Sequence, residues 1–149
     1  MLGTLFESQQ DRDKDARMRG VAHAYDVLRG TTPDGLKPTR RQTELLRILV
    51  ERQGRAKAIS IGELGERLKV APREIKADVR DLRLLFKVRI GSSRDGETGG
   101  FYLITTRDEA LDTARPFVKQ AQAEFAVAKA ILEPHELAEL EGQLRLEGA

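Results

Sequence analysis

Apolar residues recur at intervals of three and four along most of this 149-residue chain, and this spacing predicts a mainly helical protein. The expected helices cover residues 18–29, 39–54, 60–68, 72–85 and a long stretch beyond residue 106. Residues 1–17 are polar and charge-dense, so they are expected to be frayed or disordered at the start. Two prolines and a glycine in TTPDGLKP, residues 31–38, indicate a linker.

Three of these helices are expected to begin with the same capping pattern, a Ser or Thr followed three residues later by Glu or Gln. The pairs are Thr39 with Gln42, Ser60 with Glu63, and Thr106 with Glu109. In each pair the hydroxyl accepts a hydrogen bond from an early backbone N–H, and the longer side chain returns one to the cap residue. Local chemistry therefore predicts where these helices start.

Two short β-prone runs, VRI at 88–90 and FYLI at 101–104, indicate a β-hairpin. A tight hairpin needs two turn residues, whereas about ten separate these runs. The segment AKAIS at 56–60 is long enough for one further brief strand. The expected fold class is therefore α+β, mainly α with a small hairpin, carrying an N-terminal helix and a long C-terminal helical extension.

Composition excludes several kinds of chemistry. The chain has no cysteine, which rules out disulfides, thiol catalysis and cysteine-based metal sites. His23 and His135, the two histidines, lie in separate flanks without partners at metal-ligand spacing. The segment GETGG is not followed by the Lys-Ser or Lys-Thr pair of a phosphate-binding loop. We therefore expect no catalytic residues, no metal and no cofactor, so the protein is not expected to be an enzyme.

Charge is divided unevenly along the chain. Residues 37–104 hold 16 Lys and Arg against 9 Asp and Glu, whereas both flanks are net acidic. A basic middle suggests a polyanionic partner for that segment alone. With no export signal and no long apolar run, the protein is expected in the cytoplasm and away from membranes.

The expected helix at 72–86 has three faces instead of two. One face is apolar, one is basic, and one is acidic. Segregated charges favour a basic face turned toward an anion, because a merely solvated helix usually interleaves its charges. The three sets are Ile75, Val79, Leu82 and Phe86; Arg73, Lys76, Arg80 and Arg83; and Glu74, Asp78 and Asp81.

The stretch SIGELGERLKVAPREIKADVRDLR, followed by the hairpin, resembles a winged helix-turn-helix domain over residues 38–104. Leu64, Leu68 and Val70 lie at the apolar positions of the motif, and Gly65 lies where the two helices approach. Two positions depart from the pattern. Lys69 replaces the usual turn glycine, so a non-glycine residue must tolerate a left-handed or distorted backbone. Ala71 replaces the usual capping Ser or Thr.

The resemblance implies double-stranded DNA as the partner, with the second helix of the motif in the major groove and the hairpin tip, the wing, along the backbone. It assigns base or phosphate contacts on the helix, contacts on the wing, and weaker phosphate contacts at the first helix. These residues are Arg73, Lys76, Ala77, Arg80 and Arg83; Ser92, Ser93 and Arg94; and Arg40 and Arg41. Asp95 and Glu97 at the wing tip would repel phosphate.

The segment 105–149 is interpreted as a dimerisation or partner-binding extension. Its apolar and small residues alternate over three heptads, which predicts a seam for another helix. The seam is Leu111, Ala114, Val118, Ala121, Phe125, Ala128 and Leu132. It either pairs with a second copy or packs back on its own chain. Pro116 is expected to bend or split the helix, and Pro134 to begin a last amphipathic one.

Three functions are consistent with these features. The first is a sequence-specific DNA-binding regulator of transcription, of bacterial, phage or mobile-element type, acting as a homodimer. The second is a phage DNA-packaging protein similar to a small terminase subunit, or a replication accessory protein. The third is a winged-helix module that binds polymerase or another protein, which the acidic face of the 72–86 helix would favour.

Overall fold

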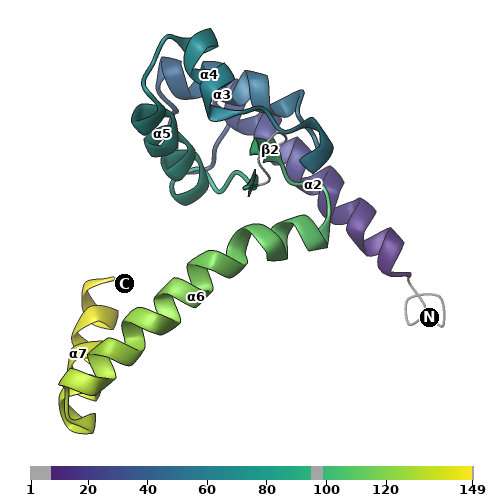
Figure 1. Ribbon diagram of the computed structural model, residues 1–149. Helices are drawn as coiled ribbons and strands as arrows, with labels where there is room; N and C mark the ends of the chain where they lie inside the picture. The colour runs from purple at the N-terminus through teal and green to yellow at the C-terminus, as the bar shows by residue number, and fades with distance from the viewer. Residues whose placement is uncertain (1–7, 95–98, 149) are drawn as a thin grey trace. The chain divides into compact units, whose positions relative to one another are not determined.

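The computed structural model describes residues 8–94 and 99–148 (Figure 1). This part of the chain is mainly helical with one two-stranded antiparallel sheet, which confirms the α+β class. The elements are α2 (Gln9–Arg29), α3 (Arg40–Val50), the 3₁₀ turn η1 (Arg55–Lys57), α4 (Ile61–Leu68), α5 (Pro72–Leu84), β1 (Ile90–Ser93), β2 (Gly100–Leu103), α6 (Arg107–Ile131) and α7 (Pro134–Glu147). The chain divides into two compact units, Met1–Thr113 and Ala114–Ala149.

The three predicted helix starts are confirmed. Thr39 and Gln42 exchange both bonds of a capping box at the start of α3. The Ser60 hydroxyl accepts from the Glu63 backbone N–H at 3.1 Å, and the Thr106 hydroxyl accepts from that of Glu109 at 3.2 Å. Each cap satisfies donors that the first helical turn would otherwise leave unpaired.

The N-terminal helix begins earlier than predicted. It starts at Gln9, so the expected disorder over residues 8–17 is wrong, while residues 1–7 lie outside the described chain. Ser8 caps the helix by accepting from the Asp11 backbone N–H at 3.2 Å. Farther along, Ala24 and Val27 are fully buried, and Nε2 of His23 donates to the Phe86 carbonyl oxygen at 2.6 Å. A capped, solvated first half thus precedes a half that packs on the core.

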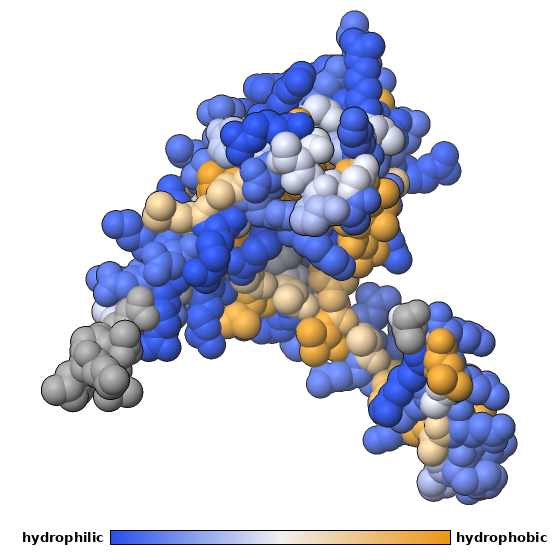
Figure 2. Space-filling view, turned by 180° about the vertical axis from the view of Figure 1, so that it is seen from behind, coloured by the Kyte–Doolittle hydropathy of each residue, from blue (hydrophilic) through white to orange (hydrophobic). Residues whose placement is uncertain are grey.

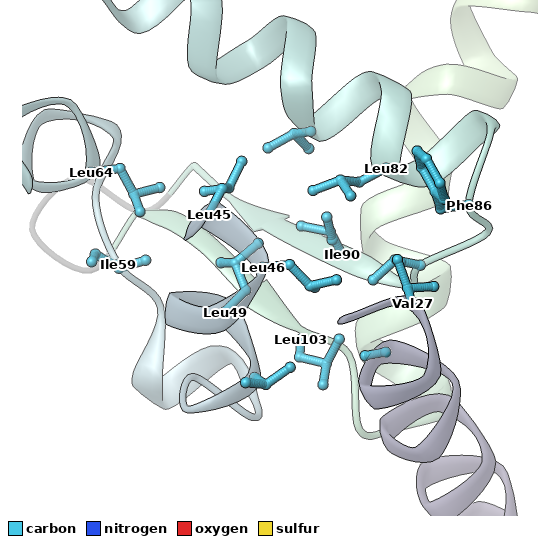
Figure 3. Close-up of a cluster of buried hydrophobic side chains, with 14 of the residues drawn as sticks. Val27, Leu45, Leu46, Leu49, Ile59, Leu64, Leu82, Phe86, Ile90 and Leu103 are labelled. Atoms are coloured by element: carbon cyan, nitrogen blue, oxygen red, sulfur yellow. The ribbon is translucent and has the colours of Figure 1, made fainter. Parts of the chain in front are cut away.

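The core of the first unit lies between the helices and the hairpin. Figure 3 shows apolar side chains from α2, α3, α4, α5 and the strands gathered in one cluster. The residues labelled there are Val27, Leu45, Leu46, Leu49, Ile59, Leu64, Leu82, Phe86, Ile90 and Leu103, and each is at most 5% exposed. The predicted apolar faces of the three central helices therefore meet in one place, which fixes α5 by burial of its inner side.

The hairpin strands lie closer to the loop than the sequence suggested. Ile90 pairs with Leu103 and Ser93 with Gly100, so only residues 94–99 lie between the strands and the estimate of about ten is wrong. Gly91 allows this pairing, because a Cβ there would lie 2.3 Å from Cζ of the fully buried Tyr102 ring. Gly91, Ser92, Ser93 and Gly100, which were expected in the loop, instead belong to the ladder.

The brief strand expected at 56–60 is reduced to a single paired residue. Residues Arg55–Lys57 form the turn η1, and within residues 56–60 it is Ile59 that bonds to β2. Its N–H donates to the Phe101 carbonyl and its carbonyl accepts from the Phe101 N–H, both at 2.9 Å. Gly100 permits this approach, since a Cβ there would lie 2.0 Å from the Ile59 carbonyl oxygen.

The second unit consists of the remainder of α6 and of α7. Pro116 does not split α6, which continues to Ile131. Among residues 114–148 none is buried, and four are half-buried, namely Ala128, Leu132, Leu137 and Glu141. Figure 2 shows hydrophobic side chains (orange) standing at the surface of this unit, at lower right, among hydrophilic ones. A helical unit without a buried side chain lacks the tertiary packing that usually stabilises helices.

Candidate nucleic-acid interface

The turn between α4 and α5 has the first of the two backbone geometries that the sequence allowed. Lys69 has φ 56° and ψ 46°, the left-handed conformation expected of the residue that replaces glycine there. Gly65 lets the turn close, because a Cβ at this position would lie 3.0 Å from the Val70 carbonyl oxygen. Ala71 provides no side-chain cap, and the carboxylate of Glu74 accepts from the Ala71 backbone N–H at 3.0 Å. The turn places α5 directly after α4.

The acidic residues of α5 do not form the exposed face that the sequence suggested. Asp78 is only 4% exposed and accepts from Nε of Arg41 at 2.5 Å and from Nη2 at 3.2 Å. Gln42 donates its amide to Asp81 at 3.2 Å. The hydrogen bond with Asp78 raises the pKa of Arg41 above its ordinary value, and Glu74 adds a weaker attraction at 3.5 Å. These carboxylates therefore tie α5 to α3.

This pairing changes the assignment of Arg41. The sequence suggested a phosphate contact for Arg40 and Arg41 at the start of α3. The structure places the guanidinium of Arg41 on the acidic side of α5 instead. Arg40 extends into solvent, with a side chain 95% exposed and a long contact of 3.6 Å to Glu44. Of the two, only Arg40 is directed toward solvent.

The outward face of α5 is basic. Arg73, Lys76 and Arg80 are exposed, and so is Ala77 between them. Within residues 8–94 and 99–148 none of the three cations forms an ion pair. Asp78 is buried against Arg41 and Asp81 is half-buried beside Gln42, so the positive charge of these three cations is not neutralised by an ion pair within the described chain.

Arg83 differs from the other basic residues of α5. It is half-buried, its Nε donates to the Ile90 carbonyl at 3.0 Å, and its guanidinium lies 6.0 Å from the centre of the Phe101 ring. Burial lowers the pKa of Arg83 below its ordinary value. Arg83 thus joins α5 to the hairpin and does not extend outward as the DNA contact that the sequence suggested.

The wing residues are partly accessible. Ser92 and Ser93 are half-buried members of β1, and the Ser92 backbone N–H donates to the Thr113 hydroxyl at 3.3 Å. Arg94 is exposed immediately after the strand. Asp95 and Glu97, whose charge would repel phosphate, lie outside the described residues. Of the three predicted wing contacts, Arg94 is the one that stands on the surface.

Sequence reasoning missed that the carboxylate of Glu109 joins η1 to the start of α6. Glu109 accepts hydrogen bonds from the backbone N–H groups of Arg55 at 2.8 Å, Thr105 at 2.9 Å and Thr106 at 3.2 Å. Burial raises its pKa, but these bonds and the Thr105 hydroxyl outweigh burial and leave the pKa below its ordinary value. The capping pair at Thr106 was the only signal in the sequence, because the bond to Arg55 spans 54 residues.

The predicted seam is largely at the surface. Leu111 is 44% exposed, Val118 54% and Phe125 43%, while Ala114 and Ala121 are also exposed. The seam's last two members, Ala128 and Leu132, are half-buried. Further large apolar side chains that the heptad pattern did not include are exposed on α6, namely Phe117, Val127 and Ile131.

Neither a metal centre nor a membrane span is found in the described chain. Across residues 8–94 and 99–148, no three His, Asp or Glu side chains are arranged to hold a metal ion. His135 is exposed, and His23 is engaged with the Phe86 carbonyl. Every helix in these two ranges is too short or too polar to cross a lipid bilayer.

Comparison with family models, with curated proteins and with solved structures finds no match for this chain. The geometry described above is therefore the basis on which a function is proposed.

Proposed function

We propose that this chain is a sequence-specific double-stranded DNA-binding protein whose residues 38–104 form a winged helix-turn-helix. Helix α5 enters the major groove, and the hairpin contacts the neighbouring backbone. The observation that carries the proposal is the sorting of charge on α5. Asp78 is paired inward with Arg41, whereas Arg73, Lys76 and Arg80 remain exposed and outside any ion pair of the described chain.

The types of side chain on the outward face suit the edges of base pairs. Arginine donates two hydrogen bonds to guanine, and the methyl group of alanine packs against the methyl group of thymine. From Arg73 to Arg80 the helix advances about 10 Å at 1.5 Å per residue, which is less than the width of the major groove of about 12 Å, so all three cations can lie inside it. Arg94 at the end of β1 supplies a contact to phosphate.

The inward pairing also bears on the alternative of a protein-interaction module. That alternative depended on an acidic surface formed by Glu74, Asp78 and Asp81. Asp78 is 4% exposed, and the amide of Gln42 donates to Asp81. Glu74 keeps a side chain that is 45% exposed, but Arg73, Lys76 and Arg80 outnumber it on the outward side of α5, which favours a polyanion over a basic protein surface.

The test is a titration of fluorescent genomic DNA fragments with wild type and with the Arg73→Ala/Arg80→Ala variant at several salt concentrations. Wild type is expected to bind with a steep salt dependence, and the variant to lose about 1 to 3 kcal/mol for each base contact removed. Lys14→Ala/Arg19→Ala is the matched control, since it removes two exposed cations of α2 that, like those of α5, form no ion pair in the described chain. Equal losses in both variants would contradict the assignment of α5.

The proposed protein acts as a homodimer through its second unit, as a regulator of transcription. Exposed apolar side chains on α6 and α7 are stabilised when a second copy covers them. Charge supports a second copy as the partner. Residues 114–131 of α6 carry three basic residues against one acidic, whereas α7 carries four acidic against one basic. Two copies can therefore place a basic helix against an acidic one.

Sedimentation velocity tests the oligomeric state. Wild type is expected to sediment as a dimer, and Val118→Glu/Phe125→Glu as a monomer, while Gln122→Glu at an exposed polar position of α6 leaves the dimer intact. A wild-type monomer contradicts the proposed dimer. A ring of many protomers would instead favour the DNA-packaging alternative.

A further inference from the structure

Two lysines bracket α5 in an unusual backbone conformation. Within the described residues, the non-glycine positions with positive φ are Lys69, at 56°, and Lys87, at 57°. Lys69 precedes α5 by three residues, and Lys87 follows its last residue by three. Both side chains are exposed, and neither forms an ion pair in the described chain.

Local stability favours glycine at both positions. Lys69 ends α4, with its backbone N–H on the Gly65 carbonyl, and the turn at Lys87 brings the Val88 N–H to the Leu82 carbonyl at 3.0 Å. Left-handed residues at helix ends are usually glycine, because a Cβ atom crowds the backbone in this conformation. The chain nevertheless has the same cationic side chain at both. Attraction to the helix dipole accounts for part of this choice, but exposure and salt weaken it.

The length of α5 suggests what the two charges do. Its 13 residues span about 20 Å, whereas the major groove is about 12 Å wide. A helix of this length lying in the groove brings both of its ends to the phosphate walls. Side chains at Lys69 and Lys87 then stand where the two backbones pass.

We infer that Lys69 and Lys87 contact phosphate groups on either side of the groove that α5 occupies, and that they set the depth and register of the helix. This inference rests on the proposed function, since it assigns new contacts to the same DNA-binding surface. It adds two residues that the resemblance to a winged helix-turn-helix did not assign. The lysines act as positioning contacts and do not read bases.

The experiment measures binding to a mixed-sequence 30-base-pair duplex by fluorescence anisotropy at several salt concentrations. The variants are Lys69→Gly/Lys87→Gly, the charge-preserving Lys69→Arg/Lys87→Arg, and the control Lys14→Ala/Lys37→Ala, which removes two exposed lysines elsewhere. Thermal unfolding is recorded for each. Because glycine suits both backbone positions, the glycine variant is expected to unfold at the same or a higher temperature than wild type.

The inference predicts that the glycine variant binds more weakly than wild type. The plot of log K against log salt becomes less steep by about two for the glycine variant, whereas the arginine variant keeps the wild-type slope. A glycine variant with the wild-type slope and affinity overturns the inference, as does an equal loss in the Lys14 and Lys37 control. A wild type that does not bind the duplex overturns the proposed function itself. The two failures are thus separate.

Discussion

Replacing Glu109 by Gln tests whether this carboxylate joins η1 to the start of α6. Its Oε2 accepts from the Arg55 N–H at 2.8 Å, and its Oε1 accepts from the backbone N–H groups of Thr105 and Thr106. Glutamine retains one acceptor oxygen and presents an amide donor where the other was. The charge-assisted hydrogen bond from the Arg55 N–H is lost, and the hydrogen bonds from Thr105 and Thr106 become bonds to a neutral acceptor. Charge-assisted bonds contribute about 1.5 to 3 kcal/mol each, and since Glu109 is half-buried we expect a loss of about 2 kcal/mol in unfolding free energy.

Urea unfolding measures this loss, and its pH dependence gives the sharper test. The pKa of Glu109 is lowered in the folded protein, so its contribution is present above the ordinary carboxyl pKa and disappears as pH falls through the lowered value. The difference between wild type and Glu109→Gln should therefore be full at pH 7 and shrink in acid below about pH 4. A difference of the same size at pH 7 and pH 3, or none at pH 7, would refute the reasoning.

Three further predictions follow from particular contacts. Gly91→Ala should lower the unfolding free energy by about 2 to 3 kcal/mol, because the new methyl group meets the buried Tyr102 ring. Urea titration measures this loss. Gly62→Ala is the control and should not lower the unfolding free energy, because the nearest atom to a Cβ there is the Ser60 hydroxyl oxygen at 4.0 Å. Arg41→Ala should lower the thermal midpoint of unfolding yet leave the salt dependence of DNA binding unchanged. A less steep salt dependence in this variant would show that Arg41 contacts phosphate. Lys69→Gly by itself should raise the thermal midpoint, and a fall measured by circular dichroism would mean that the lysine stabilises the turn.

The parts of the fold that could be predicted depend on neighbours in sequence. Capping at Thr39, Ser60 and Thr106 involves residues three positions apart, so the helix starts were read correctly. The left-handed backbone at Lys69 followed in the same way from the turn between two helices. The start of α2 was missed, because a polar and charge-dense segment does not differ in composition from a disordered one.

The parts of the candidate site that could not be predicted depend on residues far apart in sequence. A helical wheel placed Asp78 on an acidic face and Arg83 among the basic residues of α5. It could not show that Arg41, 37 positions earlier, would reach Asp78, nor that Arg83 would reach the Ile90 carbonyl. The periodicity of one helix shows which side chains share a face, but not what the neighbouring elements place against it.

The sequence by itself determined that this protein is mainly helical, that a basic segment lies between acidic flanks, and that α5 has an apolar inner face. These properties arise from composition and local spacing. Only the tertiary structure decided which charges of α5 remain outward, because the pairing of Asp78 with Arg41 requires α3 and α5 to pack together. The packing of α3 against α5 thus removes Asp78 from the surface and leaves a mainly basic outward face on α5.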